Sequence, residues 1–381
     1  MEDASYRICS RCVMDTTDPD IIFDKFGVCN HCIGFDNVLS KSWFPNDHGQ
    51  KILKKRVSEI KEKGRKQEYD CILGLSGGLD SSYLALAIKD SGLRPLVVHV
   101  DAGWNSELAV YNIEKIVKYC GYDLHTHVVD WEEVKDLQVA YLKAGVANQD
   151  VVQDHIFFAT LYQFATKNNI KYVLSGGNIA TECVYPKAWM HPAMDSINLK
   201  AIHKRYGKIK LRHYKVIGFL EYFLVYPFLK GMSTFRPLDY MHYNKDEALR
   251  ILKEVVGYKE YGRKHGESRF TRFFQNHYLP MKFNIDKRRP HLSSLILSGA
   301  LSREVAIEEL QKELYDQADL DIDKAFVAKK LGIKKEDLDL LIYSPGRDHS
   351  EFKNWNSRYR LLQVVKRNVV KFLGRNVKTY S

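Results

Sequence analysis

The sequence has 381 residues, with 58 Lys and Arg against 47 Asp and Glu, which gives a net charge of +11. This length allows two or three domains of ordinary size, and 45% hydrophobic and 28% charged residues exclude a disordered or fibrous chain. No apolar run approaches the roughly 20 residues of a membrane-spanning helix, and the N-terminus does not have the pattern of a signal peptide. We therefore expect a cytoplasmic protein.

Four of the seven cysteines form one pattern near the N-terminus. Cys9 and Cys12 make one CxxC pair, and Cys29 and Cys32 make a second. Two such pairs supply four thiolates that can close around Zn²⁺ without an open position, so we predict a structural zinc ribbon over residues 1–40. An iron–sulfur cluster is the alternative for the same four residues.

The positive charge is concentrated in three segments. Residues 41–66 carry nine Lys and Arg with three acids, residues 200–215 carry seven with none, and residues 352–381 carry eight with none. Solvated helix faces are the simplest interpretation. Nucleic acid, anionic small substrates and an acidic protein partner are the alternatives. No role is assigned to the tail, residues 352–381.

A strand–loop–helix–strand pattern follows the first basic segment. Residues 69–75 and 96–101 are apolar runs of strand length, and residues 83–89 have the composition of a helix. This order is typical of a βαβ unit in a parallel sheet.

The loop of this unit, residues 76–82, reads SGGLDSS. Its two glycines allow backbone N–H groups to face an anion. A helix that begins beside Leu79 and Asp80 adds its positive N-terminal end. The loop is therefore predicted to bind an anion, with its serines as hydroxyl donors and Asp80 as a Mg²⁺ ligand or a helix cap.

A third predicted strand, residues 171–174, ends in the sequence SGGNIATE at residues 175–182. An open α/β sheet binds ligands at the carboxyl ends of its strands. Gly176 and Gly177 are therefore predicted to lie against a ligand. Glu182 is interpreted either as a Mg²⁺ ligand or as a surface residue of the next helix.

The loop resembles the pyrophosphate loop of the PP-loop (N-type) ATP pyrophosphatases, which split ATP between its α and β phosphates. The resemblance implies an α/β fold with a parallel sheet, and ATP and Mg²⁺ as ligands. It further implies that Asp80 and Glu182 take part in catalysis. The residues implied to bind ATP come from the loop, the end of the second strand and the third turn: Ser76, Gly77, Gly78, Asp80, Ser81, Ser82, Val100, Asp101, Gly176 and Gly177.

The C-terminal half contains a stretch, residues 264–299, that is dense in His, Arg, Phe and Gln. Together with the four-cysteine pattern, it resembles the WbpG-like N-acetyl sugar amidotransferase family of surface-polysaccharide (LPS O-antigen) biosynthesis. The resemblance implies that ATP adenylates the acetamido oxygen of a nucleotide-linked N-acetyl sugar, and that ammonia then forms an acetamidino group. Lys264 and Arg269 are the predicted catalytic cations. Gly177 departs from the family pattern, which has an acidic residue in that turn.

The sequence lacks the patterns of a glutaminase. Glu2 stands where an N-terminal nucleophilic cysteine would follow Met1, and Cys71, Cys120 and Cys183 are not on glycine-flanked elbows. Ammonia must then come from solution or from another protein. The family resemblance implies a HisH/HisF-like glutaminase pair as the partner. We expect no nucleic-acid partner, and we leave a homo-oligomer open.

We predict three parts: the ribbon, a PP-loop α/β domain over residues 41–235 with a basic and aromatic insertion at about 186–233, and a mostly helical region over residues 236–381 with a basic tail. Two alternative functions stay open. A PP-loop tRNA thiolase would use Cys183 to carry sulfur. The other alternative is a non-enzymatic zinc-ribbon protein that binds nucleic acid. The SGGLDSS loop would have no function in such a protein.

Overall fold

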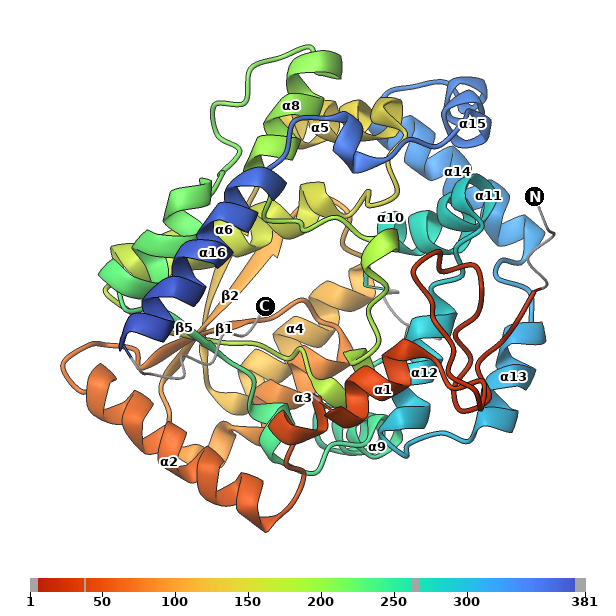
Figure 1. The fold of residues 1–381 in the computed structure, drawn as a ribbon. Helices are drawn as coiled ribbons and strands as arrows, with labels where there is room; N and C mark the ends of the chain where they lie inside the picture. Colours follow the sequence, from red (N-terminus) through yellow and green to blue (C-terminus); the bar gives the residue numbers. More distant parts are fainter. Residues whose placement is uncertain (1–5, 38, 262–266, 374–381) are drawn as a thin grey trace.

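The computed structural model describes residues 6–37, 39–261 and 267–373, with side chains described as far as residue 364. At its centre lies a parallel five-stranded sheet in the order β3-β2-β1-β4-β5 (Figure 1). The strands are β1 Cys71–Gly74, β2 Pro95–Asp101, β3 Asp123–Val128, β4 Tyr172–Leu174 and β5 Ser233–Phe235. The predicted α/β class with a parallel sheet is confirmed.

Successive residues of the central strands alternate between two cores, because side chains along a strand point to opposite faces. Leu73 and Val97 enter one core with residues of α3 and α4. Ile72 and Val98 enter the other core with residues of α6. The sheet is therefore covered on both faces by helices α3 (Leu79–Ala87), α4 (Glu107–Cys120) and α6 (Val151–Lys167).

The three predicted strands correspond to β1, β2 and β4, whose burial on both faces produces the continuous apolar runs seen in the sequence. The two edge strands were not predicted. β3 reads DLHTHV and leaves its side chains exposed or half-buried, and β5 has only three residues.

Helices make up most of the remaining chain. Before and between the strands lie α1 (Asn30–Asn37), α2 (Asp47–Gly64), α5 (Trp131–Ala144), α7 (Ile179–Glu182), α8 (Ser196–Tyr206) and a π-helix η4 (Glu221–Leu229). After β5 come α9 (Lys245–Val256), α10 (Arg269–Phe273), the π-helix η6 (Phe274–Tyr278), α11 (Leu279–Phe283), α12 (Arg288–Leu297), α13 (Arg303–Gln311), α14 (Gln317–Leu331), α15 (Lys335–Tyr343) and α16 (Asn356–Leu373). Short 3-10 turns are η1 (Leu39–Ser42), η2 (Lys89–Ser91), η3 (Lys187–Trp189), η5 (Pro237–Tyr240) and η7 (His349–Glu351).

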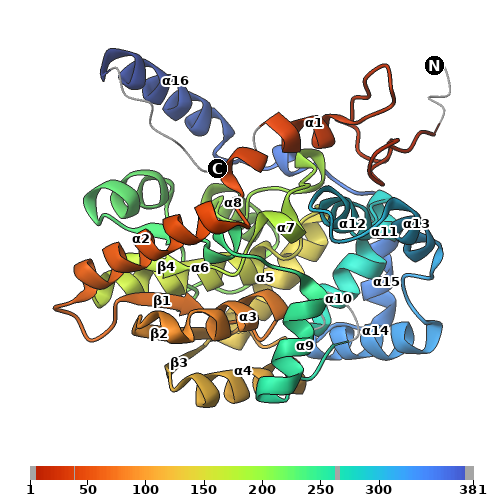
Figure 2. The ribbon, with the colours of Figure 1, turned by 90° about the horizontal axis from the view of Figure 1, so that it is seen from below.

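Among the described residues no strand follows β5, so the prediction of a mostly helical C-terminal region is confirmed. The N-terminal segment with its cysteines lies beside α12 and α13, far from it in the sequence (Figure 2). No described helix has the length and apolar character needed to cross a membrane. The exact domain boundaries stay predictions.

Candidate active site and four-cysteine centre

The SGGLDSS loop connects the end of β1 to the start of α3. Gly77 has a φ of +83°, which favours glycine, and Gly78 is the N-cap of α3. Within the loop, the Ser81 hydroxyl donates to the Gly78 carbonyl at 3.1 Å, and the Ser76 hydroxyl accepts from the Gly78 N–H at 3.2 Å. The loop thus holds its own shape at the N-terminus of a helix, the arrangement that binds anions.

The hydroxyls of two predicted loop serines, Ser76 and Ser81, therefore hold the loop backbone. The third predicted serine, Ser82, has a different environment. The Ser82 side chain is fully buried, and its hydroxyl has no hydrogen-bond partner among the described residues. A buried hydroxyl without a partner costs free energy unless a ligand satisfies it. Together with the Gly77 backbone and the helix N-terminus, this donor set fits the phosphates of a nucleotide.

Three tyrosines from the chain after β5 hold the loop in place. Tyr258 and Tyr261 donate their hydroxyls to the Gly77 carbonyl at 3.1 and 2.8 Å. Tyr243 donates to the Asp80 carboxylate. Burial, together with the negative charge of Asp80, raises the pKa of Tyr243 far above its usual range, so this hydroxyl stays a donor. Sequence analysis missed all three tyrosines, since nothing in their local pattern marks them.

The turn after β4, whose glycines are predicted to lie against a ligand, lies directly against the loop. A Cβ on Gly176 would lie 2.8 Å from the Ser81 backbone nitrogen. The Thr181 hydroxyl donates to Asp80 at 3.3 Å, and the charges of both Asp80 and Glu182 act on Tyr243. The carboxylates of Asp80 and Glu182 therefore both lie beside the contact between the loop and the turn. Carboxylate oxygens are ligands that Mg²⁺ prefers, so this pair fits the predicted ion.

The end of β2 closes the site on its other side. The His99 ring donates to the backbone carbonyl of Leu75, just before the loop, at 2.9 Å. Asp101 accepts from the Gly103 N–H at 2.8 Å and from Asn105 at 3.3 Å. Val100 is buried in the core below. Asp101 thus lies at the sheet edge where it was predicted, and its contact with ATP stays a prediction.

Acidic groups gather beside Glu182. Asp154, in the first turn of α6, is exposed to solvent, and the charges of Asp150 and Glu182 act on it. Desolvation by the surrounding protein, with the charge of Asp150 next, raises the pKa of Asp154 above its usual range, while Lys287 acts to lower it. Burial and the charge of Asp154 likewise raise the pKa of Tyr185 to about 12. A carboxyl group with a raised pKa therefore lies near Glu182.

The structure shows the partners of one of the two predicted catalytic cations. The Arg269 guanidinium pairs with Asp323 at 2.6 Å and lies 3.9 Å from the Phe326 ring centroid. Its catalytic role stays a prediction. Lys264 lies outside the described residues.

The four cysteines form a closed, buried centre. Their sulfurs all lie within 4.8 Å of one another, and the neighbouring Sγ–Sγ distances are 3.6 to 3.8 Å. Four sulfurs tetrahedrally bound at about 2.3 Å to one zinc ion would be separated by about 3.8 Å. Backbone N–H groups of Arg11, Cys12 and Cys29 point at the Cys9 sulfur at 3.3 to 3.4 Å. The donor set therefore fits a single metal ion.

Helix α12 joins this centre to the candidate active site. On one side, the Ser293 hydroxyl accepts from the Val13 N–H at 3.2 Å, and Arg289 pairs with the buried Asp15 at 3.0 Å. On the other side, the Ser294 hydroxyl accepts from the Val184 N–H at 3.0 Å, and Ser298 donates to the Ala180 carbonyl at 2.8 Å. The ribbon and the turn that carries Glu182 are thus fixed to the same helix.

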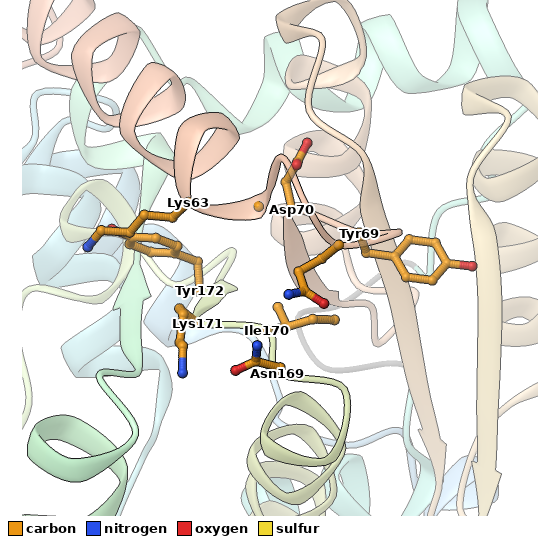
Figure 3. A pocket seen from close by; sticks show the side chains of 9 residues that line it. Lys63, Tyr69, Asp70, Asn169, Ile170, Lys171 and Tyr172 are labelled. Atoms are coloured by element: carbon orange, nitrogen blue, oxygen red, sulfur yellow. The ribbon is translucent and has the colours of Figure 1, made fainter.

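The opposite edge of the sheet carries two hollows. The smaller lies between the end of α2 and the first residues of β1 and β4, lined by Lys63, Tyr69, Asp70 and Tyr172 among others (Figure 3). Its volume is about 10 Å³, which is room for about one water molecule. The larger is open, has a volume of about 470 Å³ and is lined by Lys61, Arg65, Asp70 and Arg94 among others. We place the candidate active site at the carboxyl edge of the strands because the SGGLDSS loop lies there.

Gly176→Ala tests the contact between the turn and the loop. The added methyl group would meet the Ser81 and Asp80 backbone, and such overpacking costs about 1–3 kcal/mol, so we expect ATP to bind at least about fivefold more weakly. Gly34→Ala is the control, because nothing lies within 4 Å of a Cβ there. Calorimetric titration with a non-hydrolysable ATP analogue measures both. Equal affinities in the two variants would show that the turn does not shape the nucleotide site.

Metal analysis tests the four-cysteine centre. We expect about one zinc ion per chain, without acid-labile sulfide, and the loss of that ion in Cys12→Ser. The half-buried Cys120, which lies outside the centre, supplies the control variant Cys120→Ser, which should keep its metal. Elemental analysis by mass spectrometry gives the content. Iron with stoichiometric sulfide in the wild-type chain would contradict a single-ion site.

Comparison with known families identifies the C-terminal region. Residues 267–366 match the family described as LPS biosynthesis protein WbpG-like, C-terminal domain. No protein of curated function matches the sequence significantly. The match begins two residues before α10 and spans α12, the helix that carries the ribbon and the turn.

Three solved structures resemble the chain at low identity. The NH3-dependent NAD synthetase of Campylobacter jejuni subsp. jejuni NCTC 11168 is 17% identical, with a TM-score of 0.31 over 54% of this chain and 84% of that chain. The NMN synthetase of Francisella tularensis is 12% identical, with a TM-score of 0.34 over 71% and 98%. The U34-tRNA thiolase NcsA of Methanococcus maripaludis with its [4Fe-4S] cluster is 12% identical, with a TM-score of 0.34 over 82% and 95%. The predicted resemblance is confirmed: the chain carries a WbpG-like C-terminal domain joined to an α/β domain with the PP-loop motif.

Proposed function

We propose that the chain is an ATP-dependent C–N ligase that converts the acetamido group of a nucleotide-linked N-acetyl sugar into an acetamidino group. The observation that carries the proposal is the SGGLDSS loop, with Gly77 at positive φ and a helix N-terminus behind it, set against carboxylates at one sheet edge. The WbpG-like domain supports the amidotransferase class.

The proposed reaction has two steps. The acetamido oxygen attacks the α phosphorus of ATP, an oxygen–phosphorus bond forms, and the bond to the leaving pyrophosphate breaks. Ammonia then adds to the imidate carbon, the bond from that carbon to the oxygen breaks, and AMP leaves with the former amide oxygen. Ammonium must lose protons during this addition, so a proton acceptor is needed near the reacting carbon.

The residues of the site suit these steps. The backbone of Gly77 and Gly78 and the N-terminus of α3 would stabilise the charge that develops on pyrophosphate. Asp80 and Glu182 would hold Mg²⁺, which supplies positive charge to the phosphates when bound. Asp154 in its ionised form is suited to accept a proton from ammonium, because it lies near Glu182 and its raised pKa brings it closer to the pKa of ammonium.

Ammonia would come from a separate HisH/HisF-like glutaminase pair, in the cytoplasm. This part of the proposal follows from the family resemblance and from the absence of glutaminase patterns in the sequence. Zinc in the ribbon is proposed as structural, since four thiolates leave no open position for chemistry.

The tRNA thiolase stays the competing enzyme class, because Cys183 directly follows Glu182. Burial, however, raises the pKa of the Cys183 thiol to about 11, and its sulfur lies 3.9 Å from the Ser294 carbonyl as a donor. A sulfur carrier needs an accessible thiolate with a lowered pKa. These features favour the ligase.

The direct test incubates the protein with ATP, ammonium and candidate UDP-linked N-acetyl sugars. We expect AMP, pyrophosphate and a sugar lighter by the difference between an oxygen atom and an NH group, detected by mass spectrometry. Asp80→Asn should lower kcat/KM at least about hundredfold, because the site loses a carboxylate beside the phosphates. The exposed Asp337 supplies the control Asp337→Asn, and Cys183→Ser should stay active. AMP formation that requires tRNA and the Cys183 thiol would instead establish the thiolase.

A further inference from the structure

A lobe at the edge of the molecule is formed by two segments that are distant in the sequence. These are η4 with its flanks, residues 219–232, and the first part of α16, residues 355–364; we call them the aromatic lobe. The Phe223 ring lies 5.0 Å from Trp355 and 5.4 Å from Tyr359. Figure 2 shows α16 projecting from the body of the protein. The aromatic contacts thus fix a projecting helix to η4.

The outer surface of this lobe is apolar. Leu220, Leu224, Phe228 and Leu229 are exposed to 61, 39, 69 and 79%. Tyr226 of the same helix is only 7% exposed, so η4 has one buried face and a second apolar face in solvent. On α16, Leu361 and Val364 are exposed to 65 and 44%. An apolar surface gathered in this way marks an interaction site.

Positive charge surrounds this surface. Lys230, Arg358 and Arg360 are exposed on the same two segments, and Lys353 is exposed two residues before Trp355. The only acid in residues 216–232 and 352–364 is Glu221, whose carboxylate accepts from the Gly218 N–H at 2.6 Å. Arg205 of the second basic segment lies 5.6 Å from the ring centroid of Phe352, a buried residue just before the lobe. The surface is therefore both apolar and cationic.

We propose that the aromatic lobe binds the surface of an anionic lipid bilayer. Apolar side chains of η4 and α16 would enter the boundary between headgroups and acyl chains, and the neighbouring cations would lie at the lipid phosphates. An acidic protein surface would satisfy the cations but would leave Phe228 and Leu229 without apolar contacts. No described helix can cross a membrane, so the contact is peripheral. The proposal does not depend on the reaction proposed above.

Sedimentation of the full-length protein with vesicles tests this assignment. We expect it to bind vesicles of phosphatidylcholine with about 30 mol % phosphatidylglycerol, and to bind pure phosphatidylcholine at least about tenfold more weakly. Phe228→Ser/Leu229→Ser should lower binding at least about tenfold, since two exposed apolar side chains are removed. The control Ile322→Ser/Leu340→Ser removes side chains of similar exposure from α14 and α15 and should bind as the wild type does.

A second pair of double variants tests how much the cationic side chains contribute to vesicle binding. Arg358→Gln/Arg360→Gln should weaken binding to the anionic vesicles, while Lys54→Gln/Lys55→Gln on α2 should not. Circular dichroism and ATP-dependent AMP release without vesicles should be unchanged in Phe228→Ser/Leu229→Ser, which shows that the fold and the reaction are intact. No sedimentation of the wild type, or equal loss in the control pairs, would overturn the proposal. A concentration-dependent dimer abolished by Phe228→Ser/Leu229→Ser would overturn it in favour of self-association.

Discussion

The arrangement of this protein depends on one buried contact surface, that of helix α12. Two adjacent buried serines of this helix serve different parts of the chain, because Ser293 accepts from Val13 of the ribbon and Ser294 accepts from Val184 beyond the active-site turn. Arg303 of α13 adds hydrogen bonds to the carbonyls of Cys9 and Cys12 at 2.9 and 3.1 Å. A buried polar group left unpaired is costly, so neither neighbour can move without the helix. The segment that matches the WbpG-like C-terminal domain is thus the part that joins the four-cysteine centre to the sheet edge.

The SGGLDSS loop is likewise held by residues that are distant from it in the sequence. Local sequence gives the loop its glycines and the helix that follows it, but residues after β5 hold it in place. Asn112, fully buried on α4, donates to the Tyr261 hydroxyl at 3.0 Å, and that hydroxyl donates to the Gly77 carbonyl. The loop is therefore supported from both halves of the chain, which gives a fixed set of donors before any ligand arrives. Such preorganisation is what electrostatic stabilisation of a departing pyrophosphate requires.

The features of the fold and the site that could be predicted from the sequence are those that a short segment of the chain determines. The cysteine spacing and the SGGLDSS loop each lie within a short segment, and β1 and β2 stand out because both of their faces are buried. β3 was missed because an exposed edge strand mixes Asp123 and His125 with apolar residues. The ion pair of Arg269 with Asp323 could not be predicted from the cation-rich segment that carries Arg269, since Asp323 lies in a different helix. Two residues that are this far apart in the sequence have no fixed spacing from which their contact could be predicted.

In the proposed reaction, this sheet edge activates an amide oxygen by transferring AMP to it. An N-acetyl sugar nucleotide whose acetamido oxygen carries a heavy isotope, supplied with ATP and ammonium, tests this step directly. We expect the isotope to appear in the phosphate of AMP, because the amide oxygen leaves with that group. Isotope in inorganic phosphate together with ADP, or isotope retained in the sugar product while AMP forms, would contradict it.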